Sequence, residues 1–485
     1  MIRRQSFYIV GVLLIILGFS MLFSVGCSLI YGDGDLIPLL QSIAVTITSG
    51  LILVIFFKSK DKKDLSTHDG FAVVTLGWIA IVIFSAFPFY FSGTLDYTNS
   101  FFEAMSGLTT TGATVLGHSD TLMIEELPHG ILFWRSFTQF IGGMGIIVFS
   151  IAILPMLGMG GVQLFRAEVA GPVADKITPR VKQTAKLLWG IYVGFVLILC
   201  LILKIEGMSW FDAICHSFTT IATSGFSTKN ISIAAYGGLI QWTIIIFMFL
   251  AATNFSLHYY FIAKGKFEYY KDHEFRVYFG LCIIFSILFF INIVGTNKYQ
   301  TDLLSFRHSV FTAVSILTTT GFSTENFNEW PEMSKMLLFF LFFIGGSAGS
   351  TTGGMKIIRS ILVVKYLLYE VRKLLHPKGV FNITIGENTI DDNVVRATLG
   401  FYLFYILIFV FTAMVLSMTG LDVTTALTAS ASAIGNIGPG LGSIGPTDNW
   451  GHLSDFAKWL TSFCMLLGRL EIFTVVVLFS RSFWK

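Results

Sequence analysis

The sequence predicts an all-α polytopic membrane protein in which four helix–pore-helix–filter–helix repeats surround one pore, preceded by an N-terminal pair of helices. The 485 residues are 54% hydrophobic and 13% charged, with a mean hydropathy of +0.75, whereas soluble domains average about 25% charged residues. Apolar runs long enough to cross a bilayer as helices recur along the chain. A short hydroxyl-rich motif that ends in glycine occurs four times between such runs.

Ten apolar runs are expected to span the membrane. The first follows Arg3 and Arg4, but it is long for a signal peptide and Cys27–Ser28 is a poor cleavage site, so we expect a retained helix. The five cysteines lie in apolar runs without ligand spacing, and we interpret them as small buried or lipid-facing residues. The predicted spans are Phe7–Ile30, Leu36–Phe57, Phe71–Phe91, Leu132–Leu157, Leu187–Leu203, Leu239–Ile262, Tyr278–Val294, Met336–Leu368 (interrupted), Val394–Met418 and Phe456–Phe479.

The distribution of Lys and Arg indicates the orientation of the chain. With both termini in the cytoplasm, 24 of the 32 Lys and Arg residues fall in inner segments and seven in outer segments, as the positive-inside rule requires. Every copy of the glycine-ending motif then lies on the outer side. Sixteen acidic residues, Glu103 and Asp448 among them, also fall in outer segments. We expect these acids to concentrate cations at the mouth of the pore.

The four motif copies end at Gly112, Gly225, Gly321 and Gly438. The fourth copy is weaker, and Gly435 remains an alternative to Gly438. When the copies are aligned on the glycine, a hydroxyl residue falls six positions earlier in each. We expect every copy to form a re-entrant half-helix followed by an extended loop, in repeats of roughly a hundred residues. The predicted boundaries are 1–66 for the N-terminal two-helix unit and 67–183, 184–275, 276–390 and 391–485 for the four repeats.

The residue types of the motif suit an ion pathway better than helix packing. Small residues do let membrane helices approach closely, but packing motifs lie inside spans, not four times at one topological position. Non-helical backbone at membrane depth occurs where it lines a cavity, and glycine lets successive carbonyls turn toward one axis. Rings of carbonyls and the C-terminal ends of half-helices both favour monovalent cations. The absence of acidic side chains from the four loops argues against a Ca²⁺-type site.

The inward helix of each repeat carries a matching break, around Gly143, Ala252, Gly346 and Gly468. The third break is expanded into Gly345–Met355, which is too rich in glycine to remain helical. A phosphate-binding loop is disfavoured, because the spacing is wrong and no strand precedes it. We interpret the segment as an intramembrane loop that crosses the pore below the filter and gates it. The predicted gating residues of this loop are Gly345, Gly346, Ser347, Gly349, Gly353 and Gly354.

Arg469 is a charged residue inside a predicted span. Such a charge is costly and normally faces a cavity or a partner. An ion pair with Glu471 is the alternative, but residues two apart on a helix point in different directions. We therefore expect Arg469 to face the pore as a positive barrier and to act with the loop as the gate.

The motifs T-T-T-G and T-S-G-F-S-T resemble the degenerate filter of the Trk/Ktr/HKT superfamily of K⁺ transporters, and the similarity to bacterial Trk membrane subunits covers essentially the whole chain. The resemblance implies K⁺ bound by backbone groups of the four loops. Because all four key positions are Gly, it also implies K⁺ rather than Na⁺. The implied ion-binding residues are Thr110, Thr111, Gly112, Thr223, Ser224, Gly225, Thr319, Thr320, Gly321, Asn436, Ile437 and Gly438.

The resemblance further implies potassium uptake across the bacterial inner membrane, with K⁺ as the transported ion and no cofactor in this chain. It implies a homodimer and a cytoplasmic regulatory subunit resembling TrkA, on which any nucleotide would bind. The cytoplasmic segments Leu157–Lys186, Lys264–Arg276 and Lys365–Arg396 are basic and too short for a catalytic domain. No nucleic-acid partner is expected.

The sequence disfavours two other classes of function. A cation-coupled K⁺ or Na⁺ symporter working by alternating access would be expected to contain two inverted halves, whereas the four copies here share one orientation. An intramembrane enzyme would need a nucleophile with a base, or a set of metal ligands. His216 and His308 lie in half-helices without such partners, so no enzyme is predicted.

Overall fold

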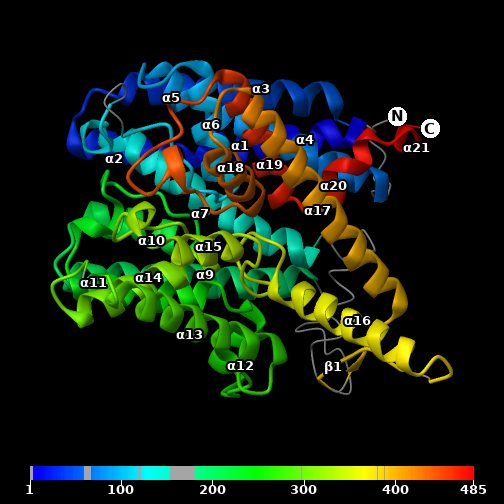
Figure 1. Ribbon diagram of the computed structural model, residues 1–485. Coiled ribbons are helices and arrows are strands. Elements are labelled where there is room, and N and C mark those ends of the chain that lie inside the picture. Colours follow the sequence, from blue (N-terminus) through cyan, green and yellow to red (C-terminus); the bar gives the residue numbers. More distant parts are fainter. Residues whose placement is uncertain are drawn as a thin grey trace.

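The computed structural model is mainly helical and describes residues 4–58, 67–117, 122–152, 181–296, 298–379, 381–386 and 388–484. The basic residues expected in the inner segments at Lys60, Lys62, Lys63, Arg166, Lys176 and Arg180 lie outside these ranges. In Figure 1 the two termini lie close together, on the side of the molecule toward which the end of α16 and strand β1 project.

The N-terminal unit is a pair of antiparallel spans. Helices α1 (Arg4–Ser20) and α2 (Leu22–Tyr31) form the first span, and α3 (Leu36–Phe57) returns with the predicted bounds. The two spans cross at Gly11 and Gly50, where a Cβ added to either glycine would lie 2.8 Å from the carbonyl oxygen of the other. Glycine at this crossing lets the two backbones touch, as is common for membrane helices.

The rest of the chain forms four repeats, each with an outward helix, a half-helix and an inward helix that is broken in the last three. The first contains α4 (Thr67–Ser85), α5 (Phe87–Phe91), α6 (Tyr97–Leu108) and α7 (His129–Ala152); the second contains α9 (Val181–Ile205), α10 (Trp210–Ile221), α11 (Gly238–Ala251) and α12 (Phe255–Lys264). The third contains α13 (His273–Val294), α14 (Asp302–Leu317), α15 (Glu332–Leu341) and α16 (Ile357–Leu375); the fourth contains α17 (Asp392–Met418), α18 (Val423–Gly435), α19 (Asp455–Arg469) and α20 (Phe473–Val476).

The remaining elements are short. A single 3₁₀ turn follows each filter loop, at η1 (Ile124–Glu126), η2 (Ser232–Ala235), η3 (Phe327–Glu329) and η4 (Gly442–Ile444). The antiparallel strands β1 (Thr384–Ile385) and β2 (Asn388–Thr389) form a hairpin between α16 and α17. The C-terminus contains η5 (Val477–Phe479) and α21 (Arg481–Trp484).

Each half-helix begins at a side-chain cap. The capping oxygen of Asp96, Ser209, Thr301 or Asp422 accepts a hydrogen bond from the backbone N–H three residues on. These are the residue types preferred at helix N-termini, because they satisfy a donor that the helix leaves free. Three of the caps lie at the same position relative to the filter glycine, while Thr301 starts α14 four residues, about one turn, earlier.

The predicted repeat boundaries at 183/184 and 275/276 fall inside α9 and α13, which begin at Val181 and His273. Helix α13 starts earlier than predicted, where Asp272 accepts a hydrogen bond from the N–H of Phe275 at 2.6 Å. The predicted boundary at 390/391 lies directly before Asp391, which caps α17.

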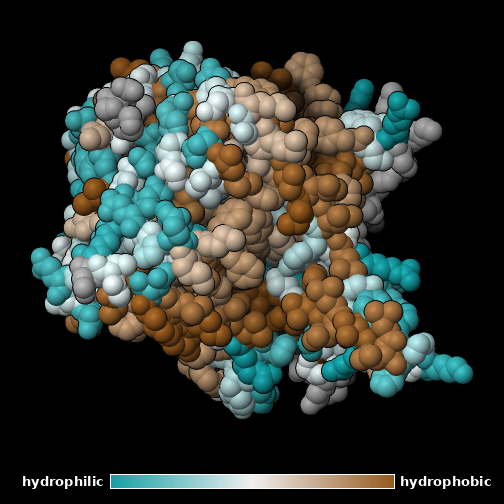
Figure 2. Space-filling view, in the orientation of Figure 1, coloured by the Kyte–Doolittle hydropathy of each residue, from teal (hydrophilic) through white to brown (hydrophobic). Residues whose placement is uncertain are grey.

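Six single helices are long and apolar enough to cross a membrane in the described part of the chain, and two bent pairs bring the number to eight. The bends are 96° between α11 and α12 and 110° between α19 and the helical turns that follow it. The other two predicted spans are α7, which carries Arg135 and Gln139, and the α15–α16 pair, which a loop interrupts. Figure 2 shows apolar side chains over the middle of the molecule, between a polar face at the left and polar side chains at the lower right.

Gly50→Val is expected to destabilise the protein by about 1–3 kcal/mol, because the new side chain would overlap the backbone of α1. Gly26→Val is the matched control, since a Cβ there meets nothing within 4 Å. Thermal unfolding in detergent, followed by circular dichroism, should give a lower Tm for Gly50→Val only. Equal Tm values for the two variants would contradict the close crossing.

Candidate functional site

The four filter loops share an unusual backbone conformation. The first residue of each triplet is not glycine and has a positive φ, and the glycine also has a positive φ. The values are 53° at Thr110, 51° at Thr223, 53° at Thr319 and 53° at Asn436, followed by 80° at Gly112, 78° at Gly225, 80° at Gly321 and 105° at Gly438. A left-handed conformation at a non-glycine residue is strained and is typical of functional sites.

The hydrogen bonds at the ends of the half-helices establish the register. In each loop the N–H of the residue before the glycine donates to the carbonyl oxygen five residues earlier. The distances are 2.8 Å for Thr111–Ser106, 3.0 Å for Ser224–Thr219, 2.9 Å for Thr320–Ser315 and 3.0 Å for Ile437–Ser432. The fourth loop follows this pattern with Gly438 as its glycine, while the alternative Gly435 is the last residue of α18.

The glycines close a ring around one axis. A Cβ at Gly112 would overlap the carbonyl oxygen of Ser224, one at Gly225 that of Thr320, and one at Gly321 that of Ile437. The circle closes where a Cβ at Gly438 would lie 2.7 Å from the carbonyl oxygen of Thr111. Each loop thus packs against the next without room for a side chain. All four glycines also line one pocket on the side predicted to face outward, which we call the vestibule.

The acids of the predicted outer segments are expected to concentrate cations at the mouth, and among the described residues few of them line the vestibule. Among the side chains lining the vestibule the one acid is Asp448, and the basic residues Arg135 and Lys229 line it as well. Glu103 is fully buried. Other outer acids are engaged in local contacts: Asp33 pairs with His129 at 2.5 Å.

Hydrogen bonds across neighbouring outer segments form a collar around the vestibule. The N–H of Ile233 donates to the Ser323 carbonyl at 3.1 Å, joining the second segment to the third. Asn328 donates from Nδ2 to the Gly442 carbonyl at 2.9 Å, joining the third to the fourth. The fourth returns to the first where Trp450 N–H donates to the Thr114 carbonyl at 2.8 Å.

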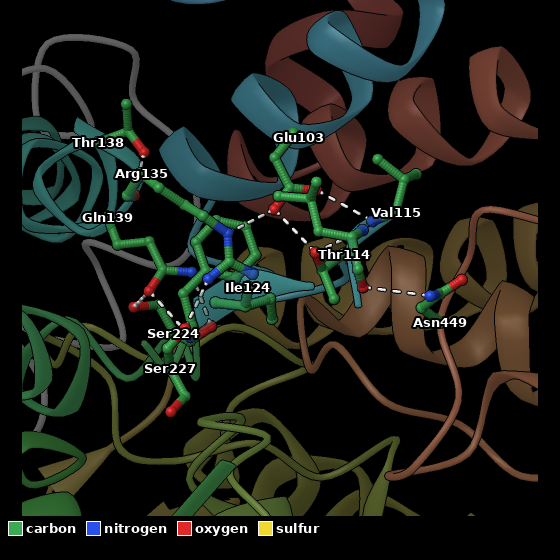
Figure 3. A network of polar contacts seen from close by, with 12 residues as sticks. Glu103, Thr114, Val115, Ile124, Arg135, Thr138, Gln139, Ser224, Ser227 and Asn449 are labelled. Atoms are coloured by element: carbon green, nitrogen blue, oxygen red, sulfur yellow. Dashed lines mark hydrogen bonds and ion pairs between the residues drawn. The ribbon is translucent and has the colours of Figure 1, made fainter. Parts of the chain in front are cut away.

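Between the first and second segments Asn230 bonds Ile124 and Glu125, and α7 adds contacts that sequence reasoning missed (Figure 3). The amide of Gln139 donates to the Ser224 carbonyl at 3.0 Å and accepts from the Ser224 hydroxyl at 2.7 Å. Arg135 donates to Glu103 at 2.7 Å and to the Ser227 carbonyl at 2.8 Å. The one sign of these contacts in the sequence is that Arg135 and Gln139 are polar residues beside or within an apolar run.

The predicted intramembrane loop, Gly345–Met355, lies between α15 and α16 at the inner ends of the half-helices. The hydroxyl of Thr351 donates to the Ile221 carbonyl at 3.1 Å and accepts from the Thr223 hydroxyl at 3.1 Å. The N–H of Gly353 donates to the Thr319 hydroxyl at 2.8 Å. These contacts place the loop directly beneath the second and third filter loops. Of the predicted gating residues, Gly353 contacts a filter residue, while Ser347 and Gly349 bond Ala252 and Phe255 at the break between α11 and α12. Gly345, Gly349 and Gly354 have positive φ.

Arg469 is buried and points at the loop. Its Nη1 donates to the Thr351 carbonyl at 2.7 Å and its Nη2 to the Gly142 carbonyl on α7 at 3.2 Å. Glu471 pairs with Arg359 of α16 instead. The structure therefore brings Arg469 together with the loop, as the sequence predicted.

Glu274 is a further contact that sequence reasoning missed. One oxygen of this buried carboxylate, Oε1, accepts hydrogen bonds from the N–H groups of Ala348 at 2.8 Å and Ile358 at 3.0 Å. The side chain thus ties the loop and the start of α16 to α13. A lone Glu at the start of an apolar helix was the only signal.

The break predicted around Gly143 is wrong for the described residues, because α7 runs as one helix from His129 to Ala152. A Cβ at Gly142 would overlap the carbonyl oxygen of Leu108, and a Cβ at Gly468 would overlap that of Ile434, four residues before Gly112 and Gly438. Gly142 is therefore the equivalent of Gly468, not Gly143. Gly143 packs beside Ala222 on the adjacent half-helix.

The sequence matches the TrkH family model, described as a cation transport protein, over residues 39–485. The chain belongs to the TrkH family of cation transport proteins. It is 40% identical to the Trk system potassium uptake protein TrkH of Vibrio parahaemolyticus, with 99% of both chains covered. It is 39% identical to TrkH of Escherichia coli K12, with 98% of both covered, and 37% identical to TrkG of that strain, with 88% of this chain and 87% of TrkG covered.

The fold agrees with this membership. The crystal structure of the potassium transporter TrkH from Vibrio parahaemolyticus matches with a TM-score of 0.91 and 38% identity, covering 99% of each chain. This member of the TrkH family is accordingly a multi-pass membrane transport protein and not an enzyme.

Ser432→Ala is expected to lower stability by about 1–2 kcal/mol, because the Ser432 hydroxyl accepts from the Gly438 N–H at 3.0 Å and donates to the Gly438 carbonyl at 2.9 Å. Ser106→Ala is the matched control, since Ser106 occupies the same column and its hydroxyl makes no hydrogen bond. Differential scanning calorimetry should give a lower Tm for the first variant only. An equal fall in Tm for both variants would show that the two hydrogen bonds of the Ser432 hydroxyl do not stabilise the fourth filter loop.

Proposed function

We propose that this protein mediates potassium uptake across the bacterial inner membrane through a channel-like selectivity filter of backbone carbonyls, with both termini in the cytoplasm. The observation that carries the proposal is the closed ring of four glycine–carbonyl contacts at one level of the molecule. Rings of carbonyls replace the hydration shell of a monovalent cation. The names of the relatives, potassium uptake proteins, agree with K⁺ as the ion.

The ion-binding groups proposed are the backbone oxygens of the twelve filter residues, Thr110–Gly112, Thr223–Gly225, Thr319–Gly321 and Asn436–Gly438. Four loops of like conformation around one axis favour a continuous pathway over two inverted halves that alternate. The C-terminal ends of α6, α10, α14 and α18 all meet at the filter, where their partial negative charge favours cations. A coupled symporter remains the alternative.

The proposed gate consists of Arg469 and the loop Gly345–Met355. Thr351 of this loop lies under the second half-helix. Arg469, on the opposite side of the pathway, donates a hydrogen bond to the Thr351 carbonyl. A buried guanidinium beneath a cation filter would repel the permeating ion. Conduction then requires the loop and Arg469 to separate.

Regulation is proposed to come from a cytoplasmic nucleotide-binding subunit resembling TrkA, and the membrane subunit is proposed to be a homodimer. Helix α16 supports the first idea, because it continues from the loop toward the side of the termini and ends in exposed Arg372 and Lys373 (Figure 1). A partner bound there could pull on α16. The loop would move with it.

Gly225→Ala is expected to lower ⁸⁶Rb⁺ uptake into liposomes by at least about tenfold, because the added methyl group would displace the Thr320 carbonyl. Gly194→Ala serves as the control, since a Cβ there meets nothing within 4 Å. Reversal potentials of the unaltered protein in asymmetric K⁺ and Na⁺ solutions test the ion directly. A reversal potential that follows Na⁺ would refute the proposal.

Arg469→Ala is expected to raise the basal ⁸⁶Rb⁺ flux of the protein without a partner, by about tenfold or more, because the positive barrier and the contact with Thr351 are both lost. Arg481→Ala, an exposed position in the C-terminal turn, should leave the flux unchanged. Unchanged or lower flux in Arg469→Ala would rule out Arg469 as part of the gate.

A further inference from the structure

Arg135 on α7 and Glu103 on α6 form an ion pair behind the filter. Their side chains are 1% and 0% exposed, and Arg135 Nε lies 2.7 Å from Glu103 Oε1. Burying two charges carries a large desolvation penalty, and a buried pair is often no more stabilising than apolar residues of the same size. The contacts that the pair makes with the filter loops offer a reason for its presence.

The carboxylate of Glu103 holds the segment that follows the first filter loop. Oε1 accepts from the Thr114 hydroxyl at 2.9 Å, and Oε2 accepts from the N–H of Val115 at 3.0 Å. Thr114 and Val115 come two and three residues after Gly112. Hydrogen bonds to an ionised carboxylate are short and strong, so they fix the backbone just above the first filter glycine.

The guanidinium of Arg135 holds the corresponding segment of the second loop. Its Nη1 donates to the Ser227 carbonyl at 2.8 Å, and its Cζ lies 3.7 Å from the centre of the Phe226 ring. Both residues directly follow Gly225. The planar fork of arginine can donate in two directions and stack on an aromatic face at once, which lysine cannot do. Figure 3 shows Arg135 between Glu103 and Ser227.

We propose that Arg135 and Glu103 are positioning residues that set the spacing between the first and second filter loops and thereby the selectivity for K⁺ over Na⁺. The inference rests on the proposed function. The two segments that the pair connects flank the contact between Gly112 and the Ser224 carbonyl. Ion sites tolerate displacements of only about 0.5 Å, and K⁺ and Na⁺ carry the same charge and differ in size. The collar contacts described for the other three boundaries are hydrogen bonds between uncharged groups.

The test compares Glu103→Gln, Arg135→Gln and the double variant in the full-length protein, reconstituted in planar bilayers. Reversal potentials under opposed K⁺ and Na⁺ gradients give the permeability ratio. All three variants are expected to lower the K⁺/Na⁺ ratio about tenfold, equivalent to about 1.4 kcal/mol. The control is Lys298→Gln with Glu329→Gln, which removes a pair of similar length, 3.0 Å, on the exposed surface. It should keep the wild-type ratio.

The double variant separates positioning from charge. Glu103→Gln leaves a buried positive charge and Arg135→Gln a negative one, whereas the double variant is neutral. A wild-type ratio in the double variant would mean that charge alone matters and would overturn the inference. A parallel fall of K⁺ and Na⁺ currents at an unchanged ratio would assign the pair to folding and overturn it too.

Arg135→Lys and Glu103→Asp extend the test if the glutamine variants do not yield folded protein by size-exclusion chromatography. Arg135→Lys keeps the positive charge but loses the planar guanidinium, and Glu103→Asp keeps the negative charge on a shorter side chain. The K⁺/Na⁺ permeability ratio should therefore still fall. If the wild-type protein prefers K⁺ over Na⁺ and the variants keep the same ratio, this inference is contradicted while the proposed function stands. A wild type without K⁺ preference would contradict the proposed function, and the inference would fall with it.

Discussion

The close contact between each filter glycine and the carbonyl of the next loop is the constraint on which the rest of the structure depends. It leaves no space for a Cβ at Gly112, Gly225 or Gly321. It also requires the four half-helices to end at one level, which the shared hydrogen bond at each C-terminus provides. The strained residues before the glycines are held by this packing, as strain at functional sites must be.

The four repeats are alike in their filter loops but differ in the packing below those loops. In the first and fourth repeats a glycine of the inner helix packs on a half-helix carbonyl, Leu108 or Ile434. At the matching carbonyl of the second repeat, Ile221, the hydroxyl of Thr351 takes that place. The loop from the third repeat therefore completes the packing of its neighbour. This explains how a glycine-rich segment can be buried below the filter without leaving the backbone groups of the second half-helix unpaired.

Much of this could be predicted from the sequence, because the signals were local and repeated. The span Leu36–Phe57, the glycine columns and the loop Gly345–Met355 follow from apolar length and composition, and they agree with the structure. The roles of Arg135, Gln139 and Glu274 could not be predicted. Their partners are backbone groups far along the chain, and a single sequence shows that a residue is polar without showing what it meets.

Other points that the sequence leaves open also have physical reasons. The number of acids in the outer segments does not show what each carboxylate contacts: Asp96 caps a half-helix and Asp33 pairs with His129. Gly142, and not Gly143, matches Gly468 because the two adjacent glycines lie on different faces of α7. Adjacent glycines are equivalent in composition and lie about 100° apart around the axis.

The ring also determines when the pathway can exist. Its closing contact joins Gly438 to Thr111, and beside it Asn436 donates to the Thr111 hydroxyl at 3.0 Å across 325 residues of chain. During synthesis the first three loops are made before their last neighbour. Until the fourth repeat is inserted, the first loop has no partner on one side and the filter has no fixed diameter. A nascent chain therefore has an open ring until its last repeat is in place, and the four loops reach their final spacing only when the protein is almost complete.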